Sequence, residues 1–120
     1  MVEFARSPDI GAVEVCGVDH LWDGEMQPFR AGDTSIVLLK INGRYHAYQA
    51  RCPHQGAALA DGELEDGLLT CPAHRWQFDA ASGRGVNPES ARLKCFPVRV
   101  IERKVLIEVA LGGVNLETEP

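Results

Sequence analysis

The 120-residue sequence predicts a small all-β domain, and three observations support this fold class. Several short stretches rich in β-branched residues are separated by turn signals, as in small all-β domains. One of those signals is Asn42-Gly43, a dipeptide that accepts the positive φ angles of a type I′ hairpin turn. Only Asp19-His-Leu-Trp22 resembles a helical turn, with Asp19 as its cap. We therefore expect mostly antiparallel sheet and little helix.

Three hairpins account for most of the expected strands. Each consists of two strand-like stretches joined by a two-residue turn, and the second hairpin separates the two segments that carry the chemistry described below. In chain order they join 34–41 to 44–48 around Asn42-Gly43, 62–65 to 68–70 around Asp66-Gly67, and 96–101 to 104–109 around Glu102-Arg103.

Length and composition predict one domain. A chain of 120 residues can bury a core without disulfides, and residues 12–110 are expected to form it, between a flexible N-terminus at 1–11 and a C-terminal tail at 111–120. No apolar run approaches the roughly 20 residues that cross a bilayer. The N-terminal segment lacks the pattern of a secretory signal, so we expect a cytoplasmic protein. A net charge of −5 disfavours nucleic acid and anionic lipid as partners.

Two segments combine thiol and imidazole groups: Cys52-Pro53-His54 and Cys71-Pro72-Ala73-His74. Each offers one thiolate and one neutral nitrogen ligand. Such a set suits a [2Fe-2S] centre in which two Cys bind one iron and two His bind the other. The Pro after each Cys fixes φ and removes one N–H, so that the remaining amides can point at sulfur. The two loops are expected to form a pseudo-symmetric clamp.

A structural zinc ion is the alternative metal. Zinc fingers place their cysteines and histidines in separate pairs, whereas this chain alternates Cys and His within each loop, which favours the cluster. Cys16 and Cys95 lie in strand-like stretches and are interpreted as structural or inert, and His20 and His46 as ordinary packing or surface residues.

The ligand set predicts the redox behaviour of such a centre. Neutral imidazoles leave the cluster less negative than four thiolates would, which places its potential at roughly −150 to +300 mV, against about −400 mV for plant-type ferredoxins. The potential should fall at alkaline pH, because an imidazole beside ferric iron loses its remaining proton more easily.

The pattern C-x-H-x16-C-x-x-H, followed by Arg75-Trp-Gln-Phe-Asp79, resembles that of the Rieske ferredoxins, over residues 12–110. The resemblance implies a Rieske fold, an antiparallel β-sandwich with a small cluster-binding subdomain, at about 50–90, formed by two ligand loops. It implies that one [2Fe-2S] cluster is bound by Cys52, His54, Cys71 and His74. Residues 82–88 match the loop that shields the cluster in that family.

Two departures from the high-potential members of the family stand out. Cysteines that would form a disulfide between the loops fall at Ala57 and Ala73, and the Gly-Ser pair that often follows the last ligand is Arg75-Trp76. These departures indicate a low-to-moderate potential carrier that serves an oxygenase.

Three shorter stretches, 21–26, 48–55 and 83–88, resemble the ferredoxin of bacterial toluene and related aromatic diiron monooxygenases. This resemblance implies a monomeric electron carrier, not an enzyme, that passes electrons from an NADH-dependent flavin and iron-sulfur reductase to a diiron hydroxylase acting on aromatic hydrocarbons. A ferredoxin of an aromatic-ring dioxygenase, the small Rieske-like subunit of a nitrite reductase and a zinc-stabilised interaction module remain the alternatives.

Overall fold

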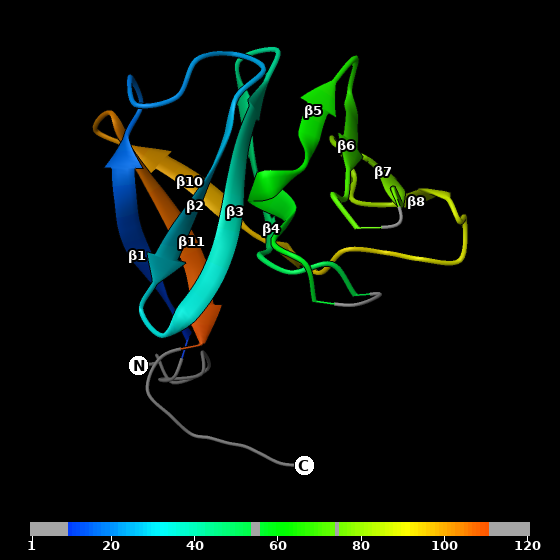
Figure 1. Cartoon of the computed structure of the whole chain (residues 1–120). Coiled ribbons are helices and arrows are strands. Elements are labelled where there is room, and N and C mark those ends of the chain that lie inside the picture. Colours follow the sequence, from blue (N-terminus) through cyan, green and yellow to red (C-terminus); the bar gives the residue numbers. More distant parts are fainter. Residues whose placement is uncertain (1–9, 54–55, 74, 111–120) are drawn as a thin grey trace.

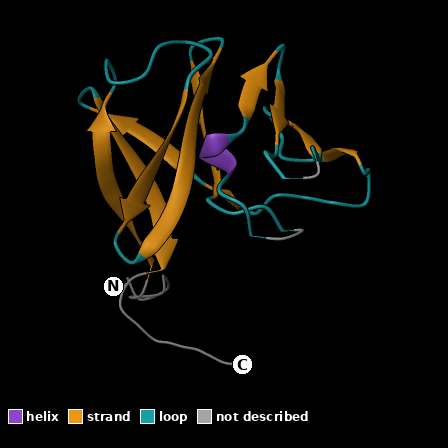
Figure 2. Cartoon of the chain, viewed as in Figure 1, coloured by secondary structure: helices purple, strands orange, loops and turns teal. Residues whose placement is uncertain are grey.

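The computed structural model describes residues 10–53, 56–73 and 75–110, which form three antiparallel sheets (Figures 1 and 2). The first sheet has the strand order β1-β11-β10, the second β2-β3-β4-β9 and the third β5-β6-β7-β8. The strands are β1 (Ile10–Gly17), β2 (Met26–Ala31), β3 (Thr34–Ile41), β4 (Arg44–Gln49), β5 (Glu63–Glu65), β6 (Leu68–Thr70), β7 (Gln77–Asp79), β8 (Gly85–Asn87), β9 (Cys95–Phe96), β10 (Val98–Ile101) and β11 (Lys104–Ala110), with one turn of 3₁₀ helix, η2 (Leu59–Asp61). The expected all-β class is confirmed.

The first two sheets pack face to face as a sandwich. Their shared core contains Ile36 and Leu38 from β3 and Val105 and Ile107 from β11, all with no exposed surface. Successive side chains of a strand point to opposite faces, so these residues occupy one face of β3.

The other face of β3 packs against the third sheet. Val37 and Leu39 belong to a second core with Leu69 of β6 and Phe78 of β7, and all four side chains are fully buried. Burial on both faces explains why β3 is a continuous apolar run and not an alternating one. The third sheet, called the smaller sheet because each of its four strands has only three residues, is therefore attached to the sandwich through a packed core. Figure 1 shows it beside β3 and β4.

The three predicted hairpins are present. Asn42 and Gly43 have φ angles of 51° and 79°, and both residues of the other two turns also have positive φ, as a type I′ turn requires. The third hairpin differs at its start, where the expected strand 96–101 is interrupted at Pro97. β9 pairs with β4, whereas β10 pairs with β11, so that one stretch of sequence serves both sheets of the sandwich.

The predicted helical turn at Asp19 is wrong. Residues 18–21 form turns and bends, and the Asp19 carboxylate forms an ion pair with Arg103 instead of capping a helix. β1 begins at Ile10, inside the segment expected to be flexible, while residues 1–9 and 111–120 lie outside the described residues. Within the part of the chain that is described, no helix has the length and apolar character needed to cross a membrane.

Candidate metal centre

The two cysteine loops have the same hydrogen-bonding pattern. The backbone N–H of Cys52 donates to the carbonyl of Ala57 at 2.8 Å, and the N–H of Cys71 donates to the carbonyl of Trp76 at 2.7 Å. In both loops the acceptor is five residues after the cysteine. Each cysteine thus begins a loop that its own backbone N–H closes, as expected for two loops that form a pseudo-symmetric clamp.

A left-handed residue closes each loop at the same position. Gly56, four residues after Cys52, has a φ of 75°, and Arg75, four residues after Cys71, has a φ of 56°. Glycine adopts this conformation without steric cost, whereas an L-residue such as arginine is strained by roughly 1–2 kcal/mol. This equivalence is not evident from the sequence, because only Gly56 is of a residue type that signals a positive φ.

The two loops bring their thiols together. Cys52 and Cys71 are 3% and 1% exposed, although they lie 19 positions apart in the chain. Burial raises the pKa of the Cys71 thiol, an N–H of Ala73 directed at its sulfur lowers that pKa, and the hydrogen-bonded Cys52 thiol raises it again. A backbone N–H therefore points at the sulfur of Cys71, one of the two predicted thiolate ligands.

This donor set fits a Rieske-type cluster. Two sulfurs side by side, shielded from water and with a backbone donor on one of them, match the two thiolate ligands of a single iron. Binding of a metal would replace the thiol protons, and the positive charge of the metal would favour the thiolate form that burial disfavours. His54, Gln55 and His74 lie outside the described residues, and the described residues alone include no group of three His, Cys, Asp or Glu that could hold a metal ion.

Apolar packing and a close backbone contact support the loops. Ala57, Ala73 and Trp76 pack against the core that contains both thiols. At Gly62, a Cβ atom would lie 1.9 Å from the carbonyl oxygen of Thr70, the residue before Cys71. The turn between η2 and β5 therefore approaches the second loop as closely as glycine allows.

The remaining cysteines and the described histidines lie away from the thiol pair. Cys16 is buried in the sandwich core, as expected, and burial followed by the charge of Glu14 raises its pKa. Cys95 lies in β9, as its strand-like surroundings predicted, and is exposed, with its thiol donating to the carbonyl of Ser82 at 3.6 Å. His20 accepts or donates a hydrogen bond with Gln27 at 3.1 Å, and His46 stacks on Tyr48, so both have ordinary packing contacts.

The fold and this site define a class: a small all-β metal-binding protein whose two similar loops present a buried pair of thiols. A family model described as the Rieske [2Fe-2S] domain matches residues 11–97. The ferredoxin component of an alkene monooxygenase system from Xanthobacter autotrophicus is 49% identical over 104 residues, covering 86% of this chain and 85% of that protein.

Two further similar proteins come from dioxygenase systems. The ferredoxin component of biphenyl 2,3-dioxygenase from Rhodococcus jostii is 31% identical, over 85% of this chain and 95% of that protein. A chain in the complex of reduced oxygenase and oxidised ferredoxin of carbazole 1,9a-dioxygenase has the same fold, with a TM-score of 0.73 at 24% identity, over 80% of this chain and 91% of that one.

The chain belongs to the Rieske [2Fe-2S] domain family. It is a ferredoxin of this family, a carrier of single electrons with one Rieske-type [2Fe-2S] cluster and not an enzyme by itself, and it belongs with the ferredoxin components of oxygenase systems.

Proposed function

We propose that Cys52 and Cys71 bind one iron of the cluster and that His54 and His74 bind the other. The observation that supports this assignment is the buried, adjacent pair of thiols in two loops of the same construction. Both loops belong to the segment at about 50–90, which we propose as the cluster-binding subdomain within a domain over 12–110. The bound cluster supplies a site that accepts and releases one electron.

The protein's own groups fix the properties of that site. The thiols lie in an apolar core, which excludes water from the sulfur side, and the N–H of Ala73 stabilises negative charge on the Cys71 sulfur. Both effects act on the redox potential, because a hydrogen bond to sulfur favours the reduced form and burial disfavours added charge.

We propose that the electrons come from an NADH-dependent flavin and iron-sulfur reductase and go to the diiron hydroxylase of a hydrocarbon monooxygenase. The relative from the alkene monooxygenase system supports a monooxygenase partner, since nearly half of the aligned residues are identical. The aromatic substrate predicted from the sequence remains a prediction, because that relative is named for an alkene. We also propose a cytoplasmic monomer that binds neither nucleic acid nor membrane, and a net charge of −5 supports the monomer and disfavours anionic partners.

A ferredoxin of an aromatic-ring dioxygenase is the second candidate function, and the 31% identical relative from a biphenyl dioxygenase system supports it. The two candidates share the cluster and the carrier role and differ only in the oxygenase that receives the electron.

The experiment begins with the visible and electron paramagnetic resonance spectra of the purified protein, where we expect a red-brown protein with a Rieske-type signal after reduction. Reduced protein is then mixed with a diiron hydroxylase and, separately, with a ring dioxygenase from the same genome. Faster oxidation by the diiron hydroxylase is the expected result. A colourless protein containing zinc would overturn the proposal, and preferential oxidation by the dioxygenase would establish the second candidate.

A further inference from the structure

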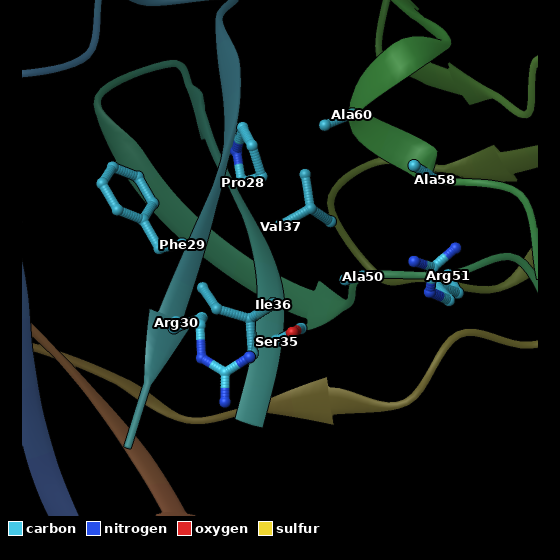
Figure 3. A pocket seen from close by; sticks show the side chains of 10 residues that line it. All are labelled: Pro28, Phe29, Arg30, Ser35, Ile36, Val37, Ala50, Arg51, Ala58 and Ala60. Carbon is cyan, nitrogen blue, oxygen red and sulfur yellow. The ribbon is translucent and has the colours of Figure 1, made fainter. Parts of the chain in front are cut away.

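A cleft of about 360 Å³ lies where the sandwich meets the connection into the smaller sheet (Figure 3). Its apolar lining comes from both sides of this junction. Pro28 of β2 and Val37 of β3 contribute from the sheet, and Ala58 and Ala60 contribute from the segment that includes η2. The cleft is separate from the buried thiol pair, although Arg51, which also lines it, directly precedes Cys52.

The register of β2 and β3 explains which side chains line the sheet side of the cleft. Pro28 pairs with Val37 and Arg30 pairs with Ser35, so alternation places these four on one face of the sheet. Phe29 packs with the sandwich core through the opposite face. The sheet side of the cleft therefore exposes Pro28 over the buried Val37, with Arg30 and Ser35 at the end of the strands.

The charge of the cleft is opposite to that of the chain. Two guanidinium groups line it, Arg30 from β2 and Arg51 from the other side, and no carboxylate is among the lining residues (Figure 3). The whole chain has 17 acidic and 12 basic residues, so a purely basic cleft departs from its average.

Neither guanidinium is neutralised by an acidic side chain within the described residues. The ion pairs found there involve Arg99, Arg103 and Lys104. Arg51 donates one N–H to the carbonyl of Gly56 at 2.8 Å, which anchors its side chain beside the first cysteine loop. A guanidinium has five N–H donors in a planar fork, so an anchored Arg51 can still bind a carboxylate.

Strand β2 is at the edge of its sheet, but Pro28 in its middle has no N–H to offer to an added strand. An incoming protein would therefore insert side chains into the cleft and not extend the sheet. A Glu or Asp side chain is complementary, because its methylene groups would contact Pro28 and the two alanines while its carboxylate binds Arg30 beside the Ser35 hydroxyl, with Arg51 adding positive charge from the opposite side (Figure 3).

We propose that this cleft is a docking site for an acidic side chain of the oxygenase component, a contact in addition to the one made at the cluster loops. This inference rests on the proposed function. The contact would hold the oxygenase beside the first cysteine loop, because Arg51 belongs to both the cleft and the segment that leads into that loop.

The test measures the concentration of cluster-loaded ferredoxin that gives half-maximal turnover of the oxygenase at low ionic strength. Arg30→Gln should raise this concentration by roughly fivefold or more, and Arg30→Glu should raise it further, since the charge pair is lost and then reversed. Arg44→Gln is the matched control, because Arg44 begins β4 whereas Arg51 follows the end of that strand. It removes the same charge away from the cleft and should change the half-maximal concentration less than about twofold. The difference between parent and Arg30→Gln should shrink as salt is added.

Three outcomes would overturn the inference while leaving the proposed function intact: equal effects of the Arg30 and Arg44 variants, a loss confined to reduction by the reductase, or a concentration-dependent dimer that Arg30→Glu abolishes. Ala60→Leu provides a second, charge-neutral test, because it fills the cleft and should weaken the same interaction. If the parent protein itself fails to reduce the oxygenase, the proposed function fails instead.

Discussion

Arg75 is strained in a position where its counterpart in the first loop is glycine. Its φ of 56° lies in the left-handed region, and so does the φ of 75° at Gly56. The hydrogen bonds that close the two loops are the same, so the second loop maintains this conformation against the preference of its side chain. The strain can therefore be measured by substituting Arg75 alone.

We predict that Arg75→Gly is more stable than Arg75→Ala by about 1 kcal/mol, because only glycine relieves the left-handed strain. At an ordinary position alanine is the more stabilising of the two. The free energy of unfolding of each cluster-loaded variant, from denaturant titration, gives the comparison. Gly56→Val is the converse test and should be less stable than the parent, since a β-branched residue fits this φ poorly. An alanine variant as stable as the glycine variant would show that Arg75 is not strained.

The second prediction at this scale concerns the cysteines. Cys52→Ser or Cys71→Ser should lose the cluster, because a hydroxyl is a poor replacement for a thiolate on iron, and the protein should become less stable since metal binding is coupled to folding. Iron and sulfide per chain and the visible spectrum are the measurements. Cys16→Ser and the exposed Cys95→Ser are controls that should stay coloured. A coloured Cys52→Ser with full iron content would refute the ligand assignment.

At the scale of the elements, the β5–β6 hairpin positions the second loop, and Gly62 positions the hairpin. Cys71 directly follows β6, and Thr70 at the end of β6 is buried. The carbonyl of Thr70 lies so close to Gly62 that a methyl group there would overlap it. A side chain at Gly62 would therefore displace Thr70 and, with it, the adjacent Cys71.

We predict that Gly62→Ala destabilises the protein by about 2–3 kcal/mol and lowers its cluster content, because the new Cβ must displace backbone and not a flexible side chain. Gly17→Ala is the control. Its Cβ would meet the Arg103 carbonyl at 3.7 Å, an ordinary contact, so it should stay within about 0.5 kcal/mol of the parent. The measurements are the iron content and the unfolding midpoint of each variant. Equal values for Gly62→Ala and Gly17→Ala would show that the second loop does not depend on this contact.

The elements also show how far the sequence could be interpreted alone. The hairpins were predictable because their turn residues encode positive φ locally, as Asn42-Gly43 does. The strands β2 and β7 were not, since Pro28 interrupts the first and the second is joined to β6 by the cysteine loop and not by a two-residue turn. The helical turn expected at Asp19 is absent, and the backbone N–H of Val18 instead donates to the carbonyl of Arg103, a distant residue that no local pattern contains.

The metal ligands were likewise predictable from the sequence, whereas the basic cleft was not. The spacing of cysteine and histidine indicated the metal chemistry, because ligand types are written directly in the sequence. The basic cleft was not predictable, since Arg30 and Arg51 come together only through the packing of η2 against the sheet that contains β2.

At the scale of the whole molecule, the two cysteine loops lie together at one end of the smaller sheet, and the sandwich supports them from the side of β3 (Figure 1). If the electron enters and leaves there, through the edges of His54 and His74, then the reductase and the oxygenase compete for overlapping surface. The ferredoxin must bind each of them weakly, through a contact at the small end of interface sizes, and shuttle between them.

The last prediction tests this arrangement with charge. Gln55→Glu or Arg75→Glu should slow electron delivery to the hydroxylase by roughly threefold or more at low salt while leaving the cluster spectrum nearly unchanged, because a charge at the rim alters encounter more than ligation. Arg44→Glu makes the same change in charge as Arg75→Glu, but at the distant end of β4, and should have little effect. Rapid mixing of reduced ferredoxin with oxidised hydroxylase measures the rate. Unaltered rates for both rim variants, or a stable ternary complex of reductase, ferredoxin and hydroxylase, would contradict the shared surface, because one end of a small domain cannot contact two partners at once.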